Sequence, residues 1–205
     1  MNPLVVLIQP PRYSPYLPPD DIEITPLEDW ELGGIALSDG TQGLQVQVWH
    51  LYVTGSATTT AVWVEAPSVP PVQLFALNNI TWARLAFDQN MHPVISYVDA
   101  YGPGFWWYDP VAQGTIFTSL PSTVMTPCVT MDDKRALQTY LGNNDVVMCY
   151  VNLGNLCYRL QRERYATEHI WYTNINLLIG NPSVNKIGMN NSLRLQIDIH
   201  GALYQ

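Results

Sequence analysis

The chain has 205 residues, of which 47% are hydrophobic and 13% are charged, which suits one domain with a sizeable core and excludes an intrinsically disordered chain. Its 9 basic and 17 acidic residues give a formal net charge of −8. This balance argues against a nucleic-acid-binding surface, because phosphate contacts need clustered Lys and Arg. Average soluble proteins are about 25% charged, so much of this surface is either polar and uncharged or covered by other subunits.

Residues 1–27 are predicted to form an extended arm, because they contain 7 of the 16 prolines. Proline fixes φ and removes an amide donor, so the arm cannot join a helix or a central strand. Residues 4–8 (LVVLI) can still pair at the edge of a sheet. Tyr13, Tyr16 and Leu17 provide apolar contacts for a surface of the chain itself or of a neighbour. A flexible leader is the alternative.

Residues 1–8 are apolar, yet no basic residue precedes the run and QPP at residues 9–11 ends it. The segment is too short for the apolar region of a secretory signal and far too short to span a bilayer. We therefore expect a chain that is made and folded in a cytoplasm, without a membrane partner.

Residues 28–205 are predicted to form one all-β domain. Strand-like runs with β-branched, aromatic or alternating apolar residues recur along it and are separated by turn signals. The runs cover residues 44–49, 58–64, 94–98, 105–108, 145–151 and 193–199. Residues 132–141 are ambiguous, because Asp132 could cap a short helix there.

A weak internal repeat runs through this domain. Four mostly apolar segments end in Asp or Asn, and each is followed by a second β-like run. The first segments are 35–39, 84–88, 129–133 and 187–191, and the second runs are 44–49, 94–98, 137–141 and 193–199. Third runs carry aromatic residues at Trp63, at 106–108 and at Tyr150.

The repeat spacing favours a propeller-like body. Asp39, Asp88 and Asp132 are separated by 49 and 44 residues, and the step to Asn190 is 58. A four-stranded propeller blade has about 40 to 50 residues. At most four such units are present, so the propeller is minimal or incomplete, and the arm or a neighbouring chain completes it. A β-sandwich is the alternative, since strands and turns recur at similar spacings by chance.

No catalytic, cofactor-binding or metal-binding set is identified in the sequence. No nucleophile elbow, zinc-protease, P-loop or dinucleotide motif is present, and the histidines share no metal-ligand spacing. Asp88 and His92, four residues apart, are a weak metal pair, and His169 beside Glu168 carries no specific signal. Cys128, Cys149 and Cys157 are odd in number and loosely spaced, which predicts buried free thiols rather than disulfides or zinc ligands.

Aromatic residues gather around a Gly-Pro-Gly turn at Tyr101, Phe105, Trp106 and Trp107. Consecutive strand residues face opposite sides, so Trp106 and Trp107 cannot both point into one core. We expect one of them to lie on an outer face, as part of a subunit interface or of a platform for carbohydrate.

Charge is unevenly distributed along the chain. No basic residue lies between Arg12 and Arg84, a stretch with eight acidic residues. The one basic cluster consists of Arg159, Arg162 and Arg164, and it is predicted to contact the acidic stretch of a neighbouring copy. A solvated acidic face is the alternative.

A Pro-rich arm, aromatic-rich β repeats, low charge and no catalytic set together make the chain resemble bacteriophage virion structural proteins, in particular tail, hub and head-to-tail components. The resemblance implies a non-enzymatic protein of the virion that forms a ring or another symmetric oligomer, threads its arm across neighbours and binds other virion proteins. No family motif matches residue by residue, so no functional residue is carried over. A lectin-like module that binds glycans through exposed aromatics, and more remotely a degraded hydrolase, are the alternatives.

Overall fold

The computed structural model describes residues 35–38, 47–56, 58–66, 69–88, 92–131, 145–177, 179–189 and 195–203. Within these ranges the chain forms strands and two three-residue 3-10 turns, η2 (Gln161–Glu163) and η3 (Ile175–Leu177). The all-β prediction is therefore confirmed. The arm at residues 1–27 and the ambiguous segment 132–141 lie outside the described residues.

The strands form four antiparallel sheets in chain order. The first sheet contains β1 (Ile35–Ser38), β2 (Gln47–Ser56), β3 (Thr59–Ala66) and β4 (Val69–Leu77). The second contains β5 (Trp82–Phe87), β6 (Pro93–Asp99), β7 (Gly102–Asp109) and β8 (Gly114–Ser119). The third contains β9 (Cys128–Met131), β10 (Val146–Asn152), β11 (Asn155–Leu160) and β12 (His169–Tyr172). The fourth contains β13 (Ile179–Met189) and β14 (Leu195–Leu203).

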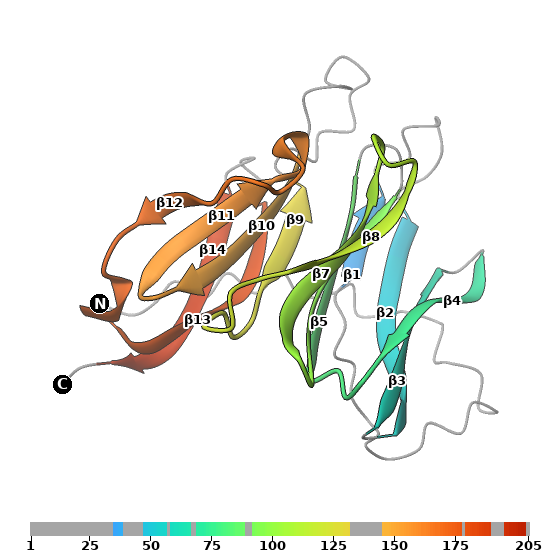
Figure 1. The fold of residues 1–205 in the computed structure, drawn as a ribbon, viewed down its shortest axis with the longest axis horizontal. Helices are drawn as coiled ribbons and strands as arrows, with labels where there is room; N and C mark the ends of the chain where they lie inside the picture. Colours follow the sequence, from blue (N-terminus) through green and yellow to red (C-terminus); the bar gives the residue numbers. More distant parts are fainter. Residues whose placement is uncertain are drawn as a thin grey trace.

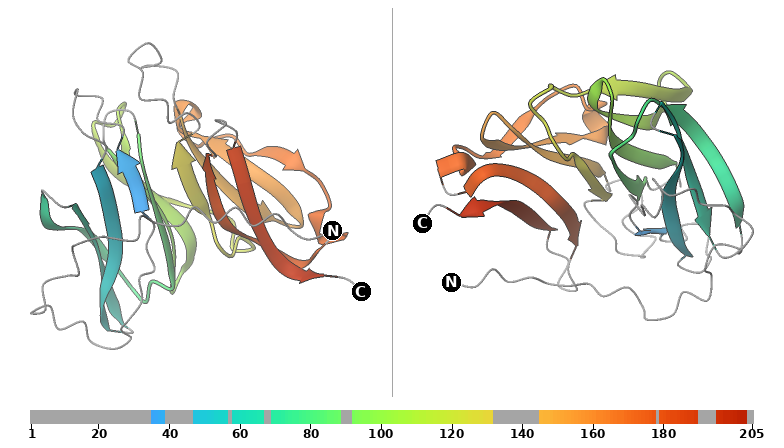
Figure 2. Two further views of the ribbon diagram at one scale, coloured as in Figure 1. Left: turned by 180° about the vertical axis from the view of Figure 1, so that it is seen from behind. Right: turned by 90° about the horizontal axis from the view of Figure 1, so that it is seen from below.

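The first strands of successive sheets are neighbours in space. β1 lies beside β5, β5 beside β9, and β9 beside β13. The sheets therefore follow one another in an arc, with β1–β4 at one end and β13–β14 at the other (Figure 1; Figure 2, right). The described strands do not close into a barrel.

The predicted repeat coincides with these sheets. Its four first segments fall on β1, β5, β9 and the end of β13, and the Asp or Asn of each comes directly after the strand. The third unit differs from the prediction in its later strands. The expected second run at residues 137–141 lies outside the described residues, and Tyr150 lies on β10, the second strand of its sheet rather than the third.

Apolar clusters fill the spaces between successive sheets. The first cluster joins side chains of β2–β4, such as Val62 and Phe75, to side chains of β5–β7, such as Ile95 and Trp106. The second joins the opposite face of the second sheet to the third sheet, and the third joins the third sheet to β13. The second and third sheets are therefore buried on both faces.

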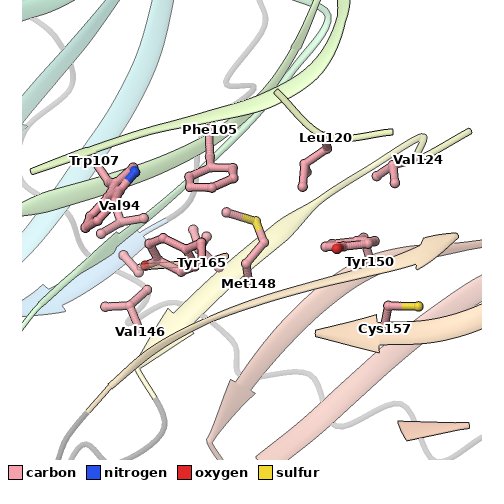
Figure 3. Packing of buried hydrophobic residues seen from close by; sticks show 12 residues of the cluster. Val94, Phe105, Trp107, Leu120, Val124, Val146, Met148, Tyr150, Cys157 and Tyr165 are labelled. Carbon is pink, nitrogen blue, oxygen red and sulfur yellow. The ribbon is translucent and has the colours of Figure 1, made fainter. Parts of the chain in front are cut away.

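Two-sided burial accounts for consecutive tryptophans on β7. Trp106 packs in the first cluster, with its ring centroid 5.2 Å from that of Phe75. Phe105 and Trp107 point the other way and pack edge-on against Tyr165, at 4.8 and 5.0 Å (Figure 3). The expectation that Trp106 or Trp107 lies on an outer face is wrong, because each occupies a different core and only 7% and 1% of their surfaces are exposed.

The three cysteines are buried free thiols, as predicted. Cys128 and Cys149 lie directly opposite each other across β9 and β10 and belong to the third cluster. Cys157 lies on the other face and belongs to the second cluster. Burial raises the pKa of Cys128 to about 12 and that of Cys157 to about 11, so both thiols are protonated and unreactive at neutral pH.

Substitution on β7 and at the turn before it tests the two-sided core. Trp107→Ala is expected to lower the free energy of unfolding by about 3–5 kcal/mol, because it removes a fully buried indole. Tyr101→Ala, at a turn residue that is 84% exposed, is expected to change it by no more than about 0.5 kcal/mol. Urea unfolding followed by circular dichroism measures both, and equal losses would contradict this arrangement.

Candidate functional site

The outer half of the third sheet is only partly covered on one side in the described residues: Leu156 of β11 packs against Ile175 of η3 in the third cluster, and no strand lies over the rest of β11 and β12. The first three sheets have four strands each, whereas the fourth has two. β13 packs on β9 and β10, the two inner strands of the third sheet. The face of β11 and β12 on that same side extends beyond the two-stranded sheet.

Three stacked rings lie on this face of β11 and β12. Tyr158 is directly opposite Cys149 on one side and His169 on the other, so it shares the face that carries the third cluster. Its ring centroid is 4.9 Å from that of His169 and 4.3 Å from that of Trp171, with the ring planes within 22° of parallel. His169 Nε2 lies 2.7 Å from Glu163 Oε2, which holds the imidazole at the edge of the stack.

Exposed apolar side chains are frequent in the part of the chain that contains the stack, although Ile170 lies opposite Cys157 and so on the other face of the sheet. Half of the large apolar side chains that the structure shows as exposed fall within residues 153–177. They are Leu153, Ile170, Trp171, Tyr172 and Leu177, which are 38% to 77% exposed. We call the surface formed by Tyr158, His169, Trp171 and Tyr172 the open face.

The sheet edge on the same side of the molecule is also unpaired. β14 pairs with β13, and among the described strands no other lies along its second edge. An unpaired strand edge presents a row of N–H and C=O groups to any further strand. Ile197 and Ile199 of β14 pack against the third cluster, which includes Leu156 of β11, so this strand lies near the open face.

A separate polar cluster joins the second and third sheets at one end. Asp88, Asp109 and Asp145 are buried carboxylates at the ends of β5 and β7 and before β10. Gln161 Nε2 donates to Asp88 at 3.1 Å, and Arg162 donates to Asp145 through its backbone N–H at 3.0 Å and its Nε at 2.7 Å. We call this set, with the ion pair between Arg164 and Asp109, the carboxylate clamp.

The backbone at the end of η2 adopts an unusual conformation that brings Arg164 to Asp109 in the carboxylate clamp. Arg164 and Tyr165 have φ of +53° and +55°, a left-handed conformation that is unfavourable for residues other than glycine. This conformation allows Arg164 to form an ion pair with Asp109, and it places the ring of Tyr165 in the core between Phe105 and Trp107. The Arg164 hydrogen bond, aided by backbone N–H donors that include Val111, holds the pKa of Asp109 below its usual range against the effect of burial.

The arginines predicted to bind a neighbour are paired within the chain. Arg159 donates through Nε to the Tyr150 hydroxyl at 2.7 Å and also lies 3.8 Å from Glu168. Arg162 and Arg164 pair with carboxylates of the clamp, although their side chains stay 60% and 52% exposed. The charge of this cluster is thus largely balanced by its own chain, and its further contact with a partner remains a prediction.

The other predicted interface residues are dispersed. Tyr101 lies at the turn between β6 and β7 and is 84% exposed, whereas Phe105, Trp106 and Trp107 are in the core. Tyr13, Tyr16 and Leu17 lie outside the described residues, as do all acidic residues of the acidic stretch except Glu65. The sequence analysis missed the open face, for which the only signal was the aromatic run at residues 169–172.

The Asp88–His92 pair closes the β5–β6 turn. Asp88 Oδ1 accepts the His92 N–H at 2.8 Å, and His92 Nδ1 lies 3.1 Å from Asp88 Oδ2. Across the described ranges, no three His, Cys, Asp or Glu side chains are placed to hold a metal ion. The same part of the chain contains no helix long and apolar enough to cross a membrane.

Comparison with known proteins identifies no relative: no family model, curated protein or solved structure matches the chain significantly. Any inference about function therefore comes from the geometry of the chain itself. Its most distinctive features are the open face and the free β14 edge.

Asp109→Asn tests whether the carboxylate clamp stabilises the fold, through the pH dependence of the stability. The lowered pKa of Asp109 in the folded state means that its stabilising effect is present above the unfolded pKa of about 3.9 and is lost as pH falls through the folded pKa. The variant is therefore expected to be less stable than the wild type at pH 7, with the difference shrinking below pH 4. Urea midpoints measured from pH 3 to pH 7 provide the comparison.

Asp99→Asn is the matched control, because Asp99 accepts turn N–H groups from Tyr101 and Gly102 without a cation. Its stability is expected to differ little from that of the wild type at any pH, since the side-chain oxygen of asparagine accepts the same backbone hydrogen bonds. If Asp109→Asn lowers the stability by the same amount at every pH, the result would contradict a stabilising ion pair between Asp109 and Arg164.

Proposed function

We propose that this chain is a non-enzymatic structural protein that works by associating with further copies of itself into a symmetric assembly, such as a ring in a virus particle. The observation that carries the proposal is the open face beside the free β14 edge. Contiguous exposed apolar surface marks interaction sites, and natural proteins rarely leave a long strand edge unprotected.

The two ends of the arc support this interpretation by their difference. β4, the edge strand of the first sheet, contains Pro70 and Pro71, and proline blocks strand addition because it has no N–H. β14 is nine residues long and contains no proline, so each of its residues has a backbone N–H; its polar side chains include the exposed pair Asp198 and His200 and no lysine. The β14 end is therefore suited to accept a partner strand, and the β4 end is not.

The arrangement of the sheets favours a propeller-like body over a sandwich. A sandwich has two sheets, each buried on its inner face only, whereas here the second and third sheets are covered on both sides. Their first strands adjoin in sequence order, as the inner strands of propeller blades do. Among the described residues the fourth unit has two strands where each of the others has four, and the completion of this unit is the role that we assign to assembly.

Placement in a virus particle is supported by the features that the chain shares with phage tail and head-to-tail proteins. These are the Pro-rich arm, the low charged fraction of 13% and the repeated β units without a catalytic set. Partners in this setting are further copies of the chain and other virion proteins.

A carbohydrate-binding module is the second candidate, and the stack of Tyr158 and Trp171 favours it. Aromatic rings form platforms for sugars, and the open face replaces the buried Trp106 and Trp107 in that role. Binding of the protein to a glycan array, lost in Trp171→Ser, would support this alternative. Assembly without glycan retention would exclude it.

Light scattering with size separation tests the proposal. The full chain is expected to be an oligomer, and a chain of residues 28–205 is expected to be monomeric with its β-sheet circular dichroism signal retained. Because the contact is apolar and main-chain, the oligomer is expected to persist at high salt. A monomeric full chain would contradict the proposal, whereas an oligomer unchanged by the deletion would support assembly and exclude a role of the arm in it.

A further inference from the structure

We propose that residues 4–8 of one copy add as a strand to the free edge of β14 in a neighbouring copy and cover its open face. This inference rests on the proposed function and names the contact that would produce the assembly. It is carried by the geometry of the fourth sheet and by the sequence of the arm.

The position beside β14 is where the repeat requires a third strand. In the second and third sheets, the third strands β7 and β11 both place side chains in the second cluster. The fourth sheet has no third strand in the described residues, so no strand faces Tyr158 on the opposite face of β11, although η3 covers that face at Leu156. A strand added about 4.8 Å from β14 would lie about 10 Å above β11, the usual spacing of packed sheets.

Residues 4–8 suit this position by composition. They read LVVLI, five consecutive apolar residues without charge, and no other segment outside the described ranges contains such a run. A continuous apolar run is typical of a strand buried on both faces. Pro3 and Pro10 flank the run and would end the strand pairing on either side.

The arm is long enough to reach a neighbouring copy. Pro-rich segments are semi-rigid and rise about 3.1 Å per residue, so residues 9–27 predict a maximum reach of roughly 60 Å. A 205-residue domain has a radius of gyration of roughly 17 Å, so a spacer of that length can carry residues 4–8 across a body or past it. The neighbouring copy is the recipient that the proposed function requires.

Such a contact is heterologous, because the arm of each copy meets a different surface on the next. Heterologous contacts close into rings or continue as filaments. Every copy would donate one strand and accept one, so removal of either the arm or the receiving surface would stop propagation.

A mixing experiment separates donor from acceptor. The chain of residues 28–205 has the receiving surface without the arm, and full-length Trp171→Asp has the arm with a charged open face. Each alone is expected to be monomeric, and a mixture is expected to form a one-to-one complex seen by light scattering. Val6→Pro in the Trp171→Asp chain is expected to weaken that complex at least ten-fold, because it removes an amide donor from the added strand.

Two matched variants guard against misfolding. Val72→Asp places the same charge on β4, at a side chain that is 43% exposed, and should leave the oligomer intact. Tyr158→Asp is a second receiving-surface variant that should behave as Trp171→Asp does, with thermal melts showing that both are folded.

The outcomes distinguish this inference from the proposed function. A wild-type oligomer that survives Val6→Pro and Trp171→Asp, with no complex in the mixture, would overturn the strand contact and leave the assembly proposal standing. A wild-type monomer would overturn both. A monomer in which the chain's own residues 4–8 protect β14 would show that the strand is added within one copy.

Discussion

The second and third sheets carry apolar side chains on both faces. Both faces must therefore be covered by other layers, and the rest of the architecture depends on this requirement. Trp106 and Trp107, adjacent on β7, are both buried because a layer of sheet lies on each side. Antiparallel sheets commonly leave one face in water, so this chain needs covering layers at every step. Among the described residues, stacking of successive meanders covers both faces of the second sheet and of the inner part of the third, and one face of the first and last sheets.

The carboxylate clamp shows how the stacked layers are kept in register. Apolar contacts between sheets are non-directional, whereas the bonds from η2 to Asp88, Asp109 and Asp145 are directional and charge-assisted. A single turn of the third sheet thereby fixes the ends of two strands in the second. Arg162 and Arg164, two of the three arginines predicted to contact a neighbour, belong to this clamp, and Arg159 contacts Tyr150 and Glu168, which leaves the apolar open face as the stronger candidate for association.

The sequence was sufficient to locate the first strands of the first three sheets and the end of β13, because an apolar run that ends in Asp or Asn is a local signal. It could not show that both faces of β7 are covered, since period-two alternation tells which side chains share a face and nothing about what lies above it. The clamp was equally hidden, because its partners are 73, 17 and 55 residues apart. The stack of Tyr158 on Trp171 depends on a bulged register between β11 and β12, which the residue pattern does not encode.

Amide hydrogen exchange on β14 tests the central claim most directly. In the full-length assembly, the β14 amides are expected to be protected like those of interior strands, while the β4 edge exchanges freely. In the chain of residues 28–205, β14 is expected to exchange as an edge strand does, with the second-sheet amides unchanged. Equal and rapid exchange of β14 in both proteins would contradict the account, because no strand would then occupy its free edge.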